Sequence, residues 1–118
     1  MSILKEVRKT LSSDGTEVYF PSQHEGECLN EYIVVKVSDA IDEIEVSSER
    51  PIYTLMLYVP KNRYSDLEDM LNETKIKMKQ LFPTLRYVGN QTDSFYDDNV
   101  KGHMISIQYE GCRKKENW

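Results

Sequence analysis

The sequence predicts an α+β domain in which two helices pack on one face of a mixed, mostly antiparallel sheet. Three observations lead to this fold class. Two segments, 3–11 and 65–81, carry apolar residues at helical spacing. Short segments rich in β-branched residues stand between and after them, and a polar turn joins the last two as a hairpin. We expect the element order α-β-β-β-β-α-β-β.

The first half of the chain begins with the helix at 3–11, which Ser12 to Gly15 end with turn-forming residues. A short strand at 17–20 stops at Pro21, and the polar residues 22–30 form a loop. The next strand, 32–37, is predicted by its β-branched composition, and a weaker strand is expected at 44–46.

The segment 52–59 is apolar at nearly every position, which is typical of a central strand buried on both faces. Ser65 and Glu68 then form a capping-box pattern at the start of the second helix, in which each side chain bonds the backbone N–H of the other. Pro83 ends this helix.

The last third is predicted as a strand at 85–88, a loop at 89–93 and a hairpin. The hairpin runs from 94–96 through the turn 97–102 into 103–110. Along its second strand, Ile105, Ile107 and Tyr109 point to one face and the residues between them to the other.

Length and composition favour a single domain over residues 1–118, with 111–118 expected to be a flexible basic tail. The net charge of −5 argues against tight binding to duplex DNA, which requires clustered cations. The apolar stretches fall far short of the roughly 20 residues of a membrane span. The N-terminus lacks the pattern of a signal peptide, so we expect a cytoplasmic protein.

The sequence carries no motif for catalysis or for a cofactor. It has no phosphate-binding glycine loop and no nucleophile elbow. A metal site would have to combine His24 and Cys28 with the distant His103 or Cys112, and a surface loop with an incidental thiol is the favoured interpretation. We expect no enzyme, no metal and no cofactor. Eight tyrosines are more than a core of this size needs, and they favour a binding or assembly module.

Four segments, 18–24, 32–36, 58–60 and above all 94–109, resemble tail terminator (tail-completion) proteins of tailed phages and prophages of Gram-positive, clostridia-like bacteria. The resemblance implies a ring, usually a hexamer, that caps the head-proximal end of the tail tube and stops its polymerisation. Its partners would be the tail tube protein, the sheath protein in contractile tails, and the head-side connector or collar. DNA would pass through the ring without catalysis, and the protein would move from the host cytoplasm into the virion.

The charges are unevenly distributed. Residues 12–50 contain ten acidic and two basic residues, a net −8, whereas the other parts of the chain are nearly balanced. One hypothesis is that carboxylates of this block face the ring channel or the tube, namely Asp39, Asp42, Glu43, Glu45 and Glu49. A second places a turn and a basic tail at contacts between rings, namely Asp97, Asp98, Lys101, Arg113, Lys114 and Lys115.

Three alternatives stay open. The chain can be another head–tail connector or minor head protein, or the collar of a phage-tail-like bacteriocin. It can be a small metal-dependent enzyme that uses His24, Cys28 and His103. It can also be an adaptor that binds a host protein.

Overall fold

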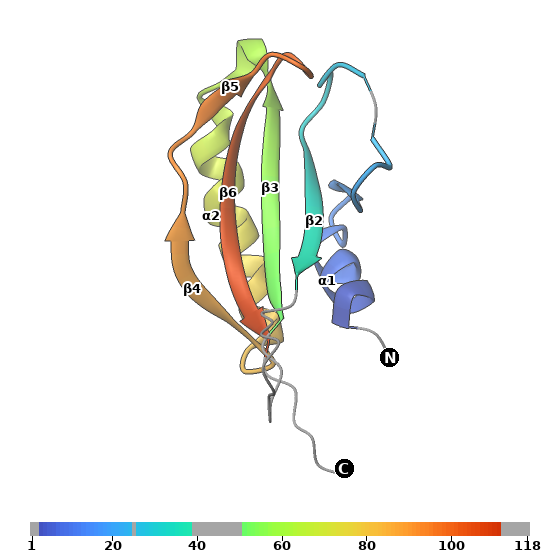
Figure 1. Cartoon of the computed structure of the whole chain (residues 1–118), viewed down its shortest axis with the longest axis vertical. Coiled ribbons are helices and arrows are strands. Elements are labelled where there is room, and N and C mark those ends of the chain that lie inside the picture. Colours follow the sequence, from blue (N-terminus) through green and yellow to red (C-terminus); the bar gives the residue numbers. More distant parts are fainter. Residues whose placement is uncertain (1–2, 25, 39–50, 112–118) are drawn as a thin grey trace.

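The computed structural model describes residues 3–24, 26–38 and 51–111. These residues form one sheet of six strands. Five strands lie side by side in the order β1-β2-β3-β6-β4, and β5 also pairs with β6 (Figure 1). Strands β1 and β2 are parallel, and the other pairs are antiparallel. The strands are β1 (Glu17–Tyr19), β2 (Tyr32–Ser38), β3 (Ile52–Pro60), β4 (Leu85–Gln91), β5 (Phe95–Asp97) and β6 (Gly102–Gly111).

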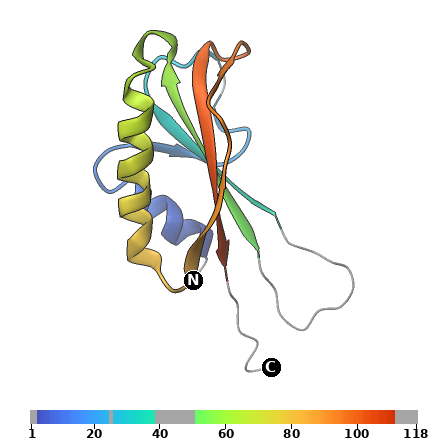
Figure 2. The ribbon, with the colours of Figure 1, turned by 90° about the vertical axis from the view of Figure 1, so that its left-hand side faces the viewer.

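Two helices, α1 (Ile3–Leu11) and α2 (Asp66–Met78), lie on the same face of this sheet (Figure 2). Their apolar sides meet the alternate strand residues that point toward them, and together these residues form one core. The predicted α+β class, with two helices on one face of a mixed sheet, is therefore confirmed. Neither helix of the described residues is long and apolar enough to cross a membrane.

Strand β3 occupies the predicted central place, between β2 and β6. Its odd-numbered residues Tyr53 to Val59 are buried under the helices, whereas Ile52, Thr54 and Met56 on the other face are half-buried. The expectation of a strand buried on both faces was therefore wrong. An apolar run can occur in a strand that has a helix layer on one side only.

The described elements follow the order α-β-β-β-α-β-β-β. The expected strand 44–46 lies outside the described residues. After the second helix the structure has three strands, which match the predicted segments 85–88, 94–96 and 103–110, although the predicted element order counted only two of them. The expected loop 89–93 was also partly wrong. Strand β4 continues to Gln91 through an irregularity after Tyr87, where Gly89 adopts a φ of +88° that suits glycine.

The prediction of a capping box at the start of α2 was also wrong. Ser65 has helical dihedral angles (φ −67°, ψ −13°), and its side chain makes no capping hydrogen bond. The chain enters α2 through a short 3₁₀ turn at Lys61–Arg63, so Ser65 already lies within the helical path. Arg63 supports this entry, because its Nε donates to Asp66 Oδ2 at 2.7 Å and its guanidinium reaches Glu31 at 3.4 Å.

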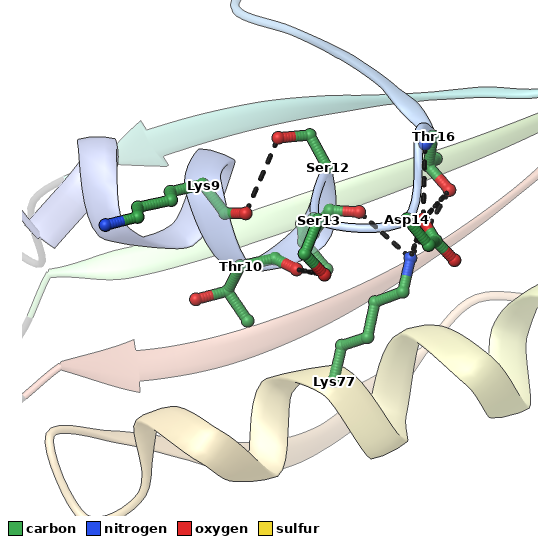
Figure 3. A network of polar contacts seen from close by, with 8 residues as sticks. Lys9, Thr10, Ser12, Ser13, Asp14, Thr16 and Lys77 are labelled. Carbon is green, nitrogen blue, oxygen red and sulfur yellow. Dashed lines mark hydrogen bonds and ion pairs between the residues drawn. The ribbon is translucent and has the colours of Figure 1, made fainter.

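The end of α1 is tied to α2 by one lysine (Figure 3). Lys77 Nζ donates to the carbonyl oxygen of Leu11 at 2.9 Å and to Asp14 Oδ1 at 2.8 Å. The Leu11 carbonyl belongs to the last turn of α1, where the helix itself supplies no partner. The hydrogen bonds from Lys77 and Thr16 lower the pKa of Asp14 to about 2.

Replacing Lys77 by Met keeps most of the side-chain volume but leaves the Leu11 carbonyl and Asp14 without this donor. We expect a loss of about 1–2 kcal/mol in the free energy of unfolding, measured by urea denaturation at pH 7. Since the folded-state pKa of Asp14 is lowered, its contribution is present above about pH 4 and disappears as the pH falls toward 2. The difference between wild type and variant should therefore shrink in acid. Lys9→Met, at an exposed position of α1, is the control, and an equal loss there would contradict the assignment.

Candidate interface at the hairpin end

The predicted β5–β6 hairpin is present, and its turn carries three of the candidate interface residues. Asp97 fixes the turn, because its Oδ1 accepts from the backbone N–H of Asn99 at 3.0 Å and its carbonyl accepts from that of Val100 at 3.3 Å. Lys101 adopts a positive φ of +55° that lets the chain enter β6. The side chains of Asp98 and Lys101 are exposed, and that of Asp97 is half-buried.

The loop before β2 braces this turn from the side. The backbone N–H of Cys28 donates to the carbonyl of Val100 at 2.6 Å, and the Cys28 side chain is buried against Gly102. A Cβ at position 102 would lie 2.8 Å from the Val59 carbonyl oxygen and 2.9 Å from the Cys28 Cβ. Glycine is therefore required where the loop, β3 and β6 meet.

Exposed aromatic side chains stand beside the turn. Tyr64, Phe95 and Tyr96 are 54%, 48% and 42% exposed. The ring of His103 packs against Tyr64 and Tyr96, with ring centroids 4.7 and 5.3 Å away, and its Nε2 lies 3.2 Å from the Lys61 carbonyl oxygen. Phe95 pairs with Met104 and points to the opposite face of the hairpin from Tyr96 and His103. We call Tyr64, Phe95, Tyr96, Asp98 and Lys101, which lie on both faces of this end of the sheet, the hairpin-end surface. Aromatic residues in a polar rim are typical of protein interfaces.

A second aromatic group is packed inward instead. The ring of His24 stacks on Tyr32 at 4.0 Å, and Tyr32 stacks on Tyr58 at 4.7 Å with the planes 6° apart. Burial raises the pKa of both tyrosine hydroxyls. This stack holds the loop before β2 against the sheet, so these tyrosines serve packing.

The residues of the alternative metal site are not arranged as metal ligands. His24 is stacked on Tyr32, and His103 lies between two tyrosines. The Cys28 Sγ donates to the Asn30 carbonyl at 3.4 Å, and burial raises the pKa of this thiol to about 11. Among residues 3–24, 26–38 and 51–111, no group of three or more His, Cys, Asp or Glu could hold a metal ion.

The other candidate residues lie outside the described part of the chain, and so does Cys112: Asp39, Asp42, Glu43, Glu45, Glu49, Arg113, Lys114 and Lys115. The strand residues next to them are described. Ser38 is paired with Ile52 and Ile52 with Glu110, so the segment 39–50 and the C-terminal residues both join the sheet at one end. The hairpin turn is at the other end, where Gly102 pairs with Asp97 and Pro60 (Figure 1).

Sequence reasoning identified the charged turn but missed most of the exposed aromatic side chains around it. The excess of tyrosines was a usable signal, although it could not separate the buried Tyr32 from the exposed Tyr64 and Tyr96. Phe95 was missed, since a phenylalanine in a strand is normally assigned to the core.

Comparisons with known proteins support the fold alone. No protein-family model matches the chain, and no curated protein is similar to it. One solved structure is similar over 98% of this chain and 99% of its own, with a TM-score of 0.53 and 12% sequence identity. The name of that protein describes no function.

The Gly102→Ala variant tests the packing that holds the hairpin end. The added methyl group would overlap the Val59 carbonyl and Cys28, so we expect a loss of about 1–3 kcal/mol in the free energy of unfolding. Gly111→Ala is the matched control in the same strand, because its nearest contacts, at 3.2–3.4 Å, are longer and are made with side-chain atoms, not with backbone. Equal stability losses in the two variants would contradict the close packing at Gly102.

Proposed function

We propose that this protein is a structural subunit of a phage tail: a tail terminator that forms a ring, hexameric as in the family it resembles, at the head-proximal end of the tail tube. The ring ends polymerisation of the tube protein and offers its other side to the connector or collar, and DNA passes through it. Its partners are further copies of the chain, the tube protein, the sheath protein where the tail is contractile, and the head-side ring.

The observation that carries this proposal is the polarity of the subunit. Strand β6 begins at the hairpin-end surface and ends where the acidic segment 39–50 and the basic residues 113–115 join the sheet. An antiparallel strand rises about 3.4 Å per residue, so the ten residues of β6 separate the two ends by roughly 30 Å. A subunit that joins two different layers of an assembly needs two unlike ends of this kind.

This arrangement revises the second sequence-based hypothesis. It assigned the turn at 97–101 and the basic tail at 113–115 jointly to contacts between rings. Since the turn and Gly111 are at opposite ends of β6, the two groups meet different neighbours in our proposal. One end would face the tube and the other the head side.

Electron microscopy of assembled particles, with an antibody fragment against this chain, tests the proposal directly. We expect density for a ring of this protein at one end of the tail tube, between tube and connector or collar. Label on the head shell, or at the tip of the tail, would contradict a tail terminator. A location in the connector itself would favour the alternative of another head–tail joining protein.

Two variants test the opposite roles of the two ends. Asp98→Lys with Lys101→Glu alters the exposed turn without changing the net charge, and removal of residues 113–118 deletes the basic tail. If the ends meet different layers, one variant should yield tubes of uncontrolled length and the other finished tails that fail to join heads. Tail length and head attachment are measured on electron micrographs of lysates. The same defect from both variants would contradict the polarity, and Lys9→Glu is the surface-charge control.

A further inference from the structure

A groove runs along the helix side of the sheet between α2 and β4. Helices α1 and α2 make most of their sheet contacts with β1, β2, β3 and β6, and β4, at the edge of the sheet beside α2, is exposed beyond Leu85 (Figure 2). The hollow has a volume of about 450 Å³, within the range of roughly 300–1,000 Å³ that ligand pockets have. Its lining includes Met78, Phe82, Leu85 and Tyr87.

The floor of this groove is apolar. Met78, Leu85 and Tyr109 are 1%, 1% and 4% exposed, and burial raises the pKa of Tyr109 to about 12. Phe82 and Tyr87 stand at the sides, 65% and 43% exposed. Exposed aromatic surface beside an apolar hollow is unfavourable in water and is typical of a surface that another chain covers.

The rim of the groove is positively charged. Lys75 and Lys79 line it, and the described lining residues include no carboxylate. Lys75 Nζ lies 4.9 Å from the centroid of the Tyr87 ring and 3.3 Å from Gln91 Oε1, so it is held over the groove by a cation–π contact and a hydrogen bond. Lys79 is exposed. An occupant that matches this surface has apolar side chains next to carboxylates.

The chain contains such a segment in its own sequence. Residues 41–46 read Ile-Asp-Glu-Ile-Glu-Val, with three β-branched apolar residues and three carboxylates. We infer that residues 41–46 of one copy bind the groove between α2 and β4 of a second copy. Ile44 and Val46 would enter the apolar floor, and Asp42 and Glu45 would pair with Lys75 and Lys79.

This inference rests on the proposed function and deepens it, because it names the contact between neighbouring subunits of the ring. The groove and the segment are different surfaces of one subunit, so the contact is heterologous and can be repeated around a ring. It also gives the carboxylates of this segment a partner on the adjacent copy, in place of the channel or tube expected from the sequence.

Charge exchange between two full-length variants tests the contact. The groove variant carries Lys75→Glu and Lys79→Glu, and the segment variant carries Asp42→Lys and Glu45→Lys. Each variant alone places like charges in the contact, so we expect its self-association to weaken about tenfold or more, measured by sedimentation velocity and native mass spectrometry. An equimolar mixture restores opposite charges at every interface of an alternating ring, so association should return. Lys9→Glu with Lys61→Glu is the matched control, and thermal unfolding confirms that each variant is folded.

The outcomes separate this contact from the ring itself. A wild-type chain that stays monomeric at every concentration overturns the inference. Association that neither charge exchange weakens also overturns it but leaves the ring proposal standing, since the subunits then meet through another surface. A further variant carries all four substitutions in one chain. If association recovers in this variant but not in the equimolar mixture, the segment binds the groove of its own chain, and the proposed contact between copies is wrong. Rings that form through this contact but are absent from tails would overturn the proposed function alone.

Discussion

Two helices cannot cover one whole face of a sheet that is five strands wide, and most other features of this molecule follow from that limit. Helices α1 and α2 bury the strand residues beneath them, such as Leu55 and Ile107, which are fully buried. The edge strand β4 is only partly covered by α2, and the groove lies between the two. On the opposite face, where the described residues form no helix layer, the loop before β2 covers part of the sheet, and its His24 stacks on Tyr32 of β2, which stacks on Tyr58 of β3. A larger helix layer would have closed the surface on which the proposed subunit contact depends.

Strand β6 links the hairpin end to the opposite end of the sheet, and it is stabilised by more partners than any other described strand. It pairs with β3 along nine residues and with β4 and β5 on its other side. Such pairing makes it a rigid element, so the distance between the turn at 97–101 and the opposite end of the sheet is fixed. Gly102 contributes to the same rigidity, because the close approach of Cys28 and β3 leaves no space for a side chain there. A subunit that sets the spacing between two layers of an assembly benefits from a stiff element of this kind.

Periodicity predicted the elements whose burial is one-sided and regular. The alternation of Ile105, Ile107 and Tyr109 and the apolar spacing of Leu67, Met70, Leu71 and Met78 both correspond to the core that the structure shows. Prediction failed where a short sequence pattern is compatible with two local structures. Ser65 and Glu68 match a capping box, but the preceding 3₁₀ turn makes Ser65 helical, and nothing in four residues reveals that turn. The groove could not be predicted either, because it depends on which strand the helices leave uncovered, a consequence of strand order rather than of any segment.

The charges near β4 also bear on how the proposed ring would avoid a symmetric pair. An edge strand such as β4 can pair with the same edge of another copy, and natural proteins often prevent this with cations on the edge. In a symmetric β4–β4 contact, Lys75 and Lys79 of both copies would approach one another, which costs free energy through like-charge repulsion. In the proposed contact, carboxylates of residues 41–46 would meet the same lysines, so the charge interaction in the groove would be attractive. In the proposed ring, Lys75 and Lys79 would therefore oppose a contact that ends assembly at a dimer and would stabilise the contact that continues around the ring.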